Sequence, residues 1–479
     1  MYRTWNPRIL EKRKITRRAV IRPETRLESL MSSPAAPNLE VSKKIFSALP
    51  EKGIRLIIIH PGSYSDHIRC DIRLATLADS PPPYYALSHV WGSDHNPEQI
   101  RLNGENFDIR KNLAKTLRQL RRGDKAVVFW IDALCINQCD EDEKRVQIPL
   151  IGDIYKEAEK VVAFLGDHDA SSRLLFKVLQ GLERQVNIGY ILMRLGSEDL
   201  ASIKDATYTF LAREYWSRAW IVQELILGRD RRIQCSTDEV SFSALQTLLD
   251  GLAGWPVVMK LSPGGPDRYA ALSPSTRWHP RFQQLLKTGS TLSTNGFLDG
   301  FLDSRCSYPQ DHIYAFYNLF PEEIKSYIEV NVKKEPEEII CQAAQGIIKE
   351  TRSLHIITLR GRQMRPVDLW QYNLPSWCPF FGVEFLNDPI LPEFSGDPIY
   401  LSNDEPIAKF SKDGKRLEVK GVMIGQICTT VFRNPLASRP FEDIDFKDEE
   451  LIPSGNMPAN AFTSSYHDLS TMLNCLRLF

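Results

Sequence analysis

Ala126-Val-Val-Phe-Trp-Ile131 is an uninterrupted apolar run in which β-branched and aromatic residues dominate. Such a run is typical of a strand that is buried on both faces of a sheet. A polar loop, a helical pattern through Ile151 and Ile154, and a second apolar run, Val161-Val-Ala-Phe-Leu-Gly166, follow in that order. The alternation of strand and helix predicts that the two runs are adjacent parallel strands, with the first one central and Phe129 fully covered.

The flanking sequence extends this pattern. Further strands are expected at Ile54–Ile59, Ile68–Leu74 and Tyr84–Val90. A helix is expected to begin at Asn112, a good capping residue, and another to run over residues 214–227. Pro149 either kinks the helix that contains it or lies in its first turn. The chain is therefore predicted to be an α/β protein with a parallel sheet covered by helices.

Three parts are expected along the chain. Residues 1–50 contain a basic cluster between residues 12 and 26, interrupted by Glu, and a small-residue and Pro stretch, so they are expected to form a disordered tail and linker. Order is expected to begin near Ile54. Residues 51–235 form the α/β domain, and residues 236–479 form a mixed, mainly helical C-terminal region.

Bulk composition narrows the function. Lys plus Arg and Asp plus Glu both number 60 among 479 residues, so no global charge attracts nucleic acid, and no nucleic-acid partner is expected. Nine Cys and no signal-like segment fit a cytoplasmic protein with free thiols. No apolar run approaches the ~18 residues of a membrane span. Cys135 and Cys139 have no second Cys or His pair at metal spacing, so no metal site is expected.

Polar residues stand where two predicted strands end. Ser88, Trp91 and Gly92 follow one strand, and Asp132 follows the apolar run. Ligands of open parallel sheets bind just beyond the carboxyl ends of the strands, so these residues are candidates for a ligand site. The structural alternative is that Trp91 covers the core and Gly92 makes a turn. Asp132 either bonds to loop amides or faces the site.

A third group lies on the helix expected at 214–227. Glu224 follows Trp220 by one helical turn, and both are candidates for the same site. The alternative for Glu224 is an ion pair with Arg218 or Arg213.

Three blocks together resemble a known family. They are Ala86-Leu-Ser-His-Val-Trp-Gly92, Trp130-Ile-Asp-Ala-Leu-Cys-Ile-Asn-Gln138 and Arg218-Ala-Trp-Ile-Val-Gln-Glu224. In this order they resemble the HET (heterokaryon incompatibility) domain of filamentous fungi. His89 stands where many members of that family have Tyr. The resemblance implies a role in self/non-self recognition, a form of fungal innate immunity in which fusion of incompatible cells triggers programmed cell death.

A more remote resemblance is to the TIR domain, which implies a flavodoxin-like sheet. Ser217, Trp220 and Glu224-Leu225 are similar to the TIR helix whose Glu cleaves NAD, although the Ser-to-Trp spacing is one residue longer here. This resemblance implies that Glu224 is catalytic and that Ser88, Trp91, Gly92, Asp132 and Trp220 bind the dinucleotide. NAD would be a substrate, and no cofactor is expected.

Two mechanisms follow from these resemblances. One is NAD hydrolysis by a TIR-like domain, and the other is a non-enzymatic adaptor that transmits a death signal by oligomerising. Self-association is expected in both, and the sequence does not identify the upstream recognition protein. A nucleic-acid-binding regulator is a third alternative, which the neutral charge disfavours.

Overall fold

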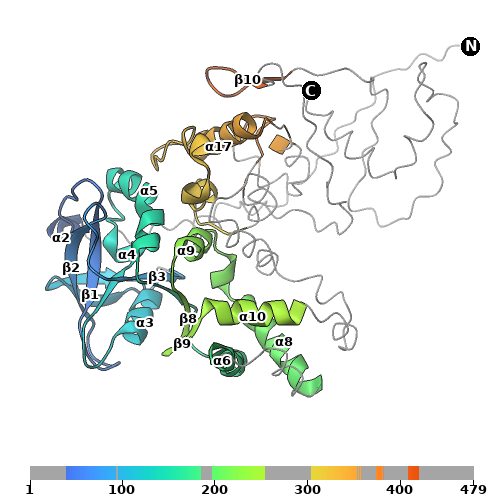
Figure 1. Cartoon of the computed structure of the whole chain (residues 1–479). Coiled ribbons are helices and arrows are strands. Elements are labelled where there is room, and N and C mark those ends of the chain that lie inside the picture. The colour runs from blue at the N-terminus through green and yellow to red at the C-terminus, as the bar shows by residue number, and fades with distance from the viewer. Residues whose placement is uncertain are drawn as a thin grey trace, which may run out of the picture.

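The computed structural model describes residues 39–92, 95–184, 197–253, 304–352, 354, 356–357, 374–379, 381 and 408–419. The basic cluster between residues 12 and 26 lies outside these ranges. The described part contains a twisted sheet with helices on both sides and a further helical group beyond it (Figure 1).

Nine strands form one sheet in the order β5-β4-β2-β1-β6-β3-β7-β8-β9. Their bounds are Gly53–Ile59 (β1), Arg69–Thr76 (β2), Tyr85–His89 (β3), Glu98–Leu102 (β4), Glu105–Ile109 (β5), Val127–Trp130 (β6), Lys160–Phe164 (β7), Arg231–Cys235 (β8) and Asp238–Ser241 (β9). The four strands β6, β3, β7 and β8 are parallel, which confirms the α/β class.

The predicted neighbour relation was wrong in one respect. β6 and β7 are parallel, but β3 lies between them: Ala86 pairs with Trp130 on one side and with Val161 on the other. The chain leaves β6, crosses β3 through a helix, and returns as β7, so strands consecutive in this stretch are not neighbours. Phe129 is 3% exposed, which confirms that β6 is a covered central strand.

The sheet is also mixed rather than parallel throughout. β1 runs antiparallel to β6, with Ile57 opposite Phe129, and antiparallel to β2. Numbered in chain order, the parallel strands β3, β6, β7 and β8 have the order 2-1-3-4, which is the flavodoxin-like order. Its switch point lies between β3 and β7, so the carboxyl end of β3 is where a ligand is expected.

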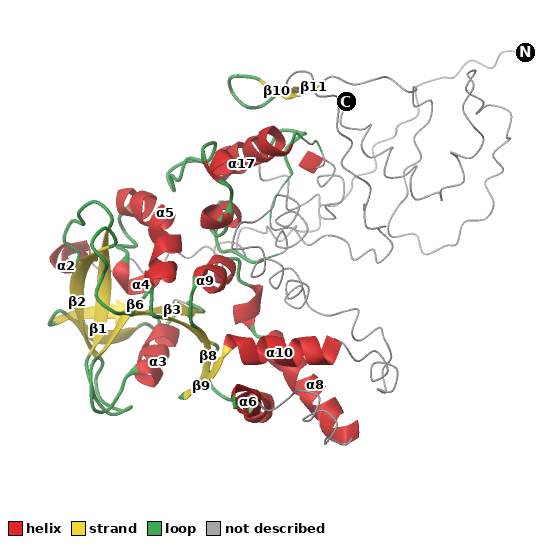
Figure 2. Cartoon of the chain, in the orientation of Figure 1, coloured by secondary structure: helices red, strands yellow, loops and turns green. Residues whose placement is uncertain are grey.

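Helices cover both faces of the sheet. Those of the first part are Leu39–Ile45 (α2), Lys111–Leu120 (α3), Asp132–Cys135 (α4), Glu141–Glu157 (α5), Ala170–Glu183 (α6), Ser197–Leu211 (α8), Glu214–Ser217 (the 3-10 helix η1), Ile221–Leu227 (α9) and Phe242–Ala253 (α10). Figure 2 shows α3 on one side of the sheet and α4 and α5 on the other. This is the arrangement that right-handed crossovers in opposite directions along a sheet produce.

Local sequence explains how several of these helices begin. Asp140 caps α5 by accepting from the amides of Asp142 and Glu143. Pro149 lies inside α5 rather than in its first turn. Asn112 does not cap α3, because its side chain donates instead to the carbonyl oxygen of Val90. Order begins before Ile54, since α2 packs on β5.

The helix expected over residues 214–227 is interrupted. η1 ends at Ser217 and α9 begins at Ile221, with extended backbone at Arg218 between them. The amide of Ala219 donates to the carbonyl of Arg305 (3.0 Å), and the amide of Arg305 donates to the carbonyl of Ser217 (2.6 Å). A distant segment therefore takes the hydrogen bonds that would have continued the helix.

The part of the chain after residue 304 is mainly helical where it is described. Its elements are Asp311–Tyr314 (α15), Tyr317–Leu319 (the 3-10 helix η2), Glu322–Lys325 (α16), Pro336–Thr351 (α17) and the hairpin strands Ala408–Phe410 (β10) and Leu417–Val419 (β11). Among the described residues, no helix is long and apolar enough to cross a membrane.

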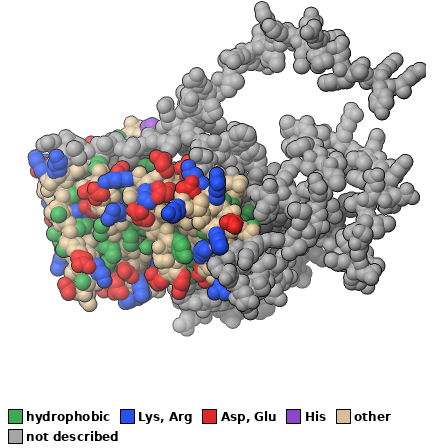
Figure 3. Space-filling model, turned by 90° about the horizontal axis from the view of Figure 1, so that it is seen from above, with side chains coloured by type: hydrophobic (Ala, Val, Ile, Leu, Met, Phe, Trp, Pro, Cys, Tyr) green, Lys and Arg blue, Asp and Glu red, His purple; other side chains and the backbone are tan. Residues whose placement is uncertain are grey.

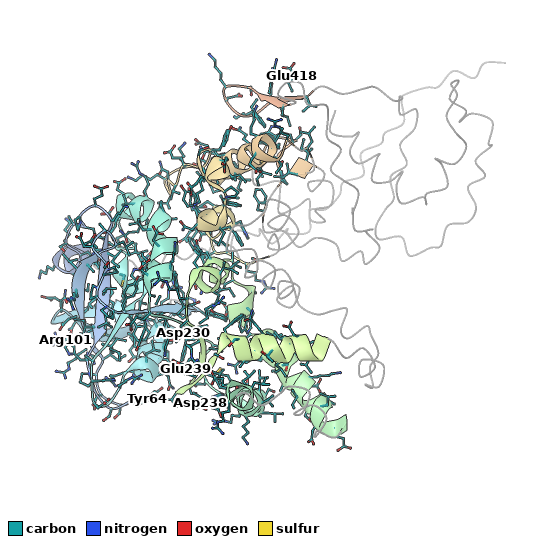
Figure 4. All side chains as sticks on the ribbon, in the orientation of Figure 1. Tyr64, Arg101, Asp230, Asp238, Glu239 and Glu418 are labelled. Carbon is teal, nitrogen blue, oxygen red and sulfur yellow. The ribbon has the colours of Figure 1, made fainter. Side chains whose placement is uncertain are left out.

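Charged side chains of both signs are interspersed on the face of the molecule that Figure 3 shows. At the β9 edge, labelled by Asp238 and Glu239 in Figure 4, Glu239 accepts from Lys160 (2.9 Å) and from Arg232 (2.9 Å). Such paired charges on an edge strand discourage pairing with another chain.

Candidate functional site

Ser88 and Glu224 meet at the carboxyl end of β3. The Ser88 hydroxyl donates a hydrogen bond to Oε2 of Glu224, which α9 carries, and lies 2.7 Å from the hydroxyl of Tyr215. Ser88 is 1% exposed and Glu224 is 4% exposed, so the group is covered in this conformation. Three side chains from three elements thus form one continuous hydrogen-bonded chain beside the switch point of the sheet.

The burial of Glu224 changes its acidity. Loss of water around the carboxyl raises its pKa to about 7, and the nearby Arg218 guanidinium and the Ser88 hydrogen bond oppose that rise only in part. Burial also raises the pKa of the Tyr215 phenol, and the negative charge of Glu224 adds to the rise. The carboxyl therefore exchanges its proton near neutral pH while the phenol stays protonated, which suits a group that stabilises positive charge or moves a proton.

Asp132 organises a second group next to the first. Its Oδ2 accepts from the indole N–H of Trp91 (2.8 Å), and its Oδ1 accepts from the amide of Ala133 (2.8 Å). Nδ1 of His89 lies 3.9 Å from the same Oδ1. Asp132 thus bonds to an amide of the first turn of α4 rather than to a loop amide, and it also accepts from Trp91, another candidate site residue.

His89 is neutral in this environment. Burial lowers its pKa to about 4, more than the neighbouring Asp132 carboxylate raises it. Arg218 donates to the carbonyl oxygen of His89, so the end of β3 is tied to the extended link before α9. The cation near Glu224 is therefore the guanidinium of Arg218 rather than an imidazolium.

Trp91 and Gly92 are held by the beginning of α3. The Arg110 guanidinium lies 5.2 Å from the centre of the Trp91 ring and donates to the carbonyl oxygen of Gly92 (2.7 Å). Gly92 has a φ of +70°, and a Cβ there would lie 3.0 Å from Cβ of Asn112. A glycine is required at this turn for both reasons. Trp91 is half-buried.

Trp220 lies apart from the Ser88–Glu224 pair in its contacts. Its indole N–H donates to Oδ2 of Asp311 (3.2 Å), which belongs to the segment after residue 304. Burial raises the pKa of Asp311 to about 7. The structure thus brings Ser88 together with Glu224, and Trp91 together with Asp132. Trp220 instead contacts Asp311, and the sequence around Trp220 did not predict this contact.

Several contributing residues were not predicted. Tyr215 completes the hydrogen-bonded chain, and Tyr155 of α5 donates to the carbonyl oxygen of Leu87 (2.8 Å) just before Ser88. The position of Tyr215 three residues before the third block was an available signal. Tyr155 falls on the apolar face of its helix, and the pattern gave no sign that its hydroxyl reaches β3.

A buried ion pair fixes the loop after β6. Arg55 is 0% exposed and donates to both carboxylate oxygens of Glu143, at 2.6 and 3.0 Å. Arg55 also donates to the carbonyl of Cys135 (3.0 Å), and Glu143 accepts from the amide of Asn137 (2.7 Å). This pair holds the Asp132–Asp140 loop in place, and the sequence does not reveal it because 88 positions separate the partners.

The cysteines of this loop are a poor metal site. Burial raises the pKa of the Cys135 thiol, which disfavours the thiolate that binds metals. Cys139 is exposed. Within the described ranges, no three His, Cys, Asp or Glu side chains gather as metal ligands.

The fold and site define an α/β domain with a carboxyl group buried at the switch point of its parallel strands. Residues 84–224 match the family model described as Heterokaryon incompatibility protein (HET). The chain is also 30% identical to Heterokaryon incompatibility protein 6, OR allele, of Neurospora crassa over 258 residues, covering 45% of this chain and 38% of that protein. Over residues 84–224 this chain is therefore similar to the HET family.

The match leaves much of the relative uncovered, since the chain spans 38% of the relative's length. No solved structure gives a significant match. All three blocks that carry the resemblance lie within or at the border of the matched range, and they are the residues that surround Ser88, Asp132 and Glu224.

Proposed function

We propose that this chain is an effector of heterokaryon incompatibility that acts in the cytoplasm and triggers cell death when incompatible fungal cells fuse. The HET match over residues 84–224 and the name of the Neurospora crassa relative, a heterokaryon incompatibility protein, support this role. The recognition step is assigned to another protein, whose identity the described structure does not reveal.

We propose further that the domain hydrolyses NAD with Glu224 as the catalytic carboxylate. The observation that carries this proposal is the buried carboxyl of Glu224 on Ser88, at the carboxyl end of β3 beside the switch point. Cleavage of the nicotinamide–ribose bond develops positive charge on the sugar, and a nearby carboxylate stabilises that charge. Nicotinamide leaves as a neutral molecule, so no general acid is needed.

The sheet supports the TIR-like part of this proposal. The strand order 2-1-3-4 of β3, β6, β7 and β8 is that of flavodoxin-like folds, in which the ligand lies at the switch point. Trp91, half-buried beside Arg110, provides a flat ring and a cationic group near this point. Gly92, Asp132 and Ser88 complete the proposed dinucleotide site, and Trp220 supports it from outside through Asp311.

NAD cannot reach Glu224 without a rearrangement, because Ser88 and Glu224 are both covered. We therefore assign the described conformation to a resting state. Clustering of several copies is the expected trigger, since assembly can expose α9 or complete the site from a neighbouring copy. Self-association is part of the proposal for this reason.

The burial of the Ser88–Tyr215–Glu224 cluster also favours a second function, which is non-enzymatic. Ser88, Tyr215 and Glu224 satisfy one another's hydrogen bonds, which is what a purely structural polar cluster does. In that case the domain is a non-enzymatic adaptor that transmits the death signal by oligomerising.

Expression of the full chain in a fungal host separates the two functions. Cell death and NAD content are measured together for the wild type, Glu224→Gln and the matched control Glu157→Gln, whose side chain forms an exposed pair with Arg229. The enzymatic proposal predicts NAD loss and death for the wild type and the control, and neither for Glu224→Gln. Death at unchanged NAD in all three would leave the adaptor in its place.

A further inference from the structure

The segment after residue 304 lies directly against the helix that carries Glu224. Arg305 forms backbone hydrogen bonds with Ser217 and Ala219 just before α9. Asp311 then accepts from the indole of Trp220, the residue that precedes the first turn of α9. Figure 1 shows α9 between the sheet and this later group of helices. The N-terminal end of α9 is therefore bound to a region outside the family match, which ends at residue 224.

The second contact of the later segment is made by Asn318 of η2, whose side chain lies against both α9 and α5. Its amide lies 3.2 Å from the side-chain oxygen of Gln223, which is 0% exposed and needs a partner for each of its polar atoms. With the Asn318 amide turned, its nitrogen faces the carbonyl of Pro149 at 2.8 Å and its oxygen faces the amide of Gly152 at 3.1 Å. Turning the Gln223 amide as well lets its nitrogen donate to Asn318.

The Asn318 side chain packs directly against Gly152 of α5. A Cβ at Gly152 would lie 2.6 Å from both Cβ and Cγ of Asn318, closer than real Cβ contacts allow. Glycine is unfavourable in the middle of a helix, and α5 already contains Pro149. The close approach of Asn318 explains why a glycine stands here, and it shows that the segment docks on α5 through a shape-matched contact.

α9 depends on these contacts for its orientation. It spans only Ile221–Leu227, about two turns, and so short a helix is held by tertiary packing rather than by its own hydrogen bonds. Trp220 and Gln223 bind the later segment, and Glu224 follows directly and binds Ser88. Moving the segment removes two of the contacts that hold α9 in the position where Glu224 meets Ser88.

We propose that residues 305–318 form a latch that positions α9 and keeps Glu224 covered, with Asp311 and Asn318 as its positioning residues. The part of this inference that concerns regulation of catalysis rests on the proposed function, whereas the control of α9 by the latch does not. Release of the latch uncovers Glu224 and is the step that an upstream protein or clustering would drive.

Hydrogen exchange of the α9 amides in the full chain tests the latch. Gly152→Ala pushes Asn318 away without altering any latch residue, and Gly123→Ala is its matched control, because a Cβ at Gly123 meets nothing within 4 Å. The latch predicts that Gly152→Ala speeds exchange at residues 221–227 on the order of tenfold, while the amides of α3 stay protected and Gly123→Ala has no effect. Unchanged protection of α9 would overturn it.

A second variant guards against general damage to the core. Trp220→Phe removes the N–H that donates to Asp311, together with part of the ring, and is expected to speed α9 exchange by a smaller factor. In the double variant Gly152→Ala with Asn318→Gly the overlap is relieved but the latch contact is still absent, so α9 exchange is expected to stay as fast as in Gly152→Ala. Loss of protection in α3 together with α9 in both single variants would show an ordinary core contact and would overturn the latch.

Nicotinamide release from NAD by the same purified variants, each clustered through a fused oligomerisation tag, separates the two proposals. Faster release by Gly152→Ala than by the wild type supports both. No release by any variant, with faster exchange at α9, rejects the enzymatic function and leaves the latch standing. Release that is equal in all variants, with unchanged exchange at α9, rejects the latch and leaves the enzymatic function standing.

Discussion

The Ser88 hydroxyl donates to the Glu224 carboxylate across 136 positions of the chain. This hydrogen bond ties the end of a central parallel strand to α9, so the first and third blocks of the HET motif meet in space. The second block joins them through Asp132, whose side chain binds Trp91 of the first block. The three blocks therefore meet at one candidate site, to which each contributes a polar side chain.

Replacing Ser88 should disturb Glu224 in a defined direction. Ser88→Ala removes the hydrogen bond that lowers the pKa of Glu224, so that pKa should rise further. It also leaves the Tyr215 hydroxyl without its partner, at a cost of about 1 to 3 kcal/mol of unfolding free energy. Infrared titration of the carboxyl and urea denaturation measure the two effects. Ser243→Ala, at an exposed position of α10, should change neither, and an unaltered carboxyl titration in Ser88→Ala would contradict the proposed pairing.

Glu224→Gln should change the pH dependence of stability. The folded-state pKa of Glu224 is about 7, above its ordinary value near 4.5, so the folded protein holds a proton that the unfolded chain has lost between these pH values. Stability from this group is fully present below about pH 4.5 and is lost as pH rises through about 7. Above pH 7, Glu224→Gln should therefore be more stable than the wild type, because it removes a buried charge.

The contribution of Glu224 is obtained from the difference in unfolding free energy between the wild type and Glu224→Gln at each pH. Asp311 also has a raised pKa, whereas His89 and His312 have lowered ones, and these groups change stability in opposite directions over the same pH range. They are common to both proteins and cancel in the difference. Denaturant unfolding from pH 4 to pH 8 gives this difference, and a difference that does not vary with pH would mean that Glu224 titrates as an exposed carboxyl.

Glu143→Ala should be among the more costly polar substitutions. It leaves the Arg55 guanidinium, which is 0% exposed, without its carboxylate, and breaking a buried pair in this way costs about 3 to 5 kcal/mol. Glu157→Ala breaks the exposed pair with Arg229 and should cost about 0 to 1 kcal/mol. Urea midpoints compare the two variants. Equal small losses would show that Arg55 is reached by water in solution.

The tryptophans should divide between core and site. Trp216 is buried with edge-to-face contacts to Phe210 (5.9 Å) and Tyr215 (5.1 Å), so Trp216→Ala should cost about 3 to 5 kcal/mol. Trp91 is half-buried at the strand end, and Trp91→Ala should cost clearly less while weakening any ligand binding there. Thermal unfolding distinguishes them, and equal destabilisation would place Trp91 in the core.

Local pattern was enough to predict the central strand and the residues at the strand ends. The run Ala126–Ile131 has the composition of a strand covered on both faces, and Phe129 is indeed buried. Pattern did not predict that β3 lies between β6 and β7, because strand order depends on where the crossover helices pack. It also gave no sign that β1 runs antiparallel to β6, since periodicity carries no information on strand direction.

The partners of the site residues were the least predictable part. Arg55 and Glu143, or Gly152 and Asn318, are far apart in the sequence, and each looks ordinary in its own segment. The expected helix over residues 214–227 failed for a related reason: Arg305 competes for the backbone groups at Ser217 and Ala219. A single sequence contains the residues of such contacts but not their pairing.

Nicotinamide release from NAD by the purified full chain, forcibly clustered through a fused oligomerisation tag, tests the central claim most directly. The account predicts release by the clustered wild type, little by the monomer, and none by clustered Glu224→Gln, which should remain folded because glutamine keeps the shape of the protonated carboxyl and a bond with Ser88. Release by clustered Glu224→Gln at the wild-type rate, or none by the clustered wild type, would contradict the catalytic role of Glu224.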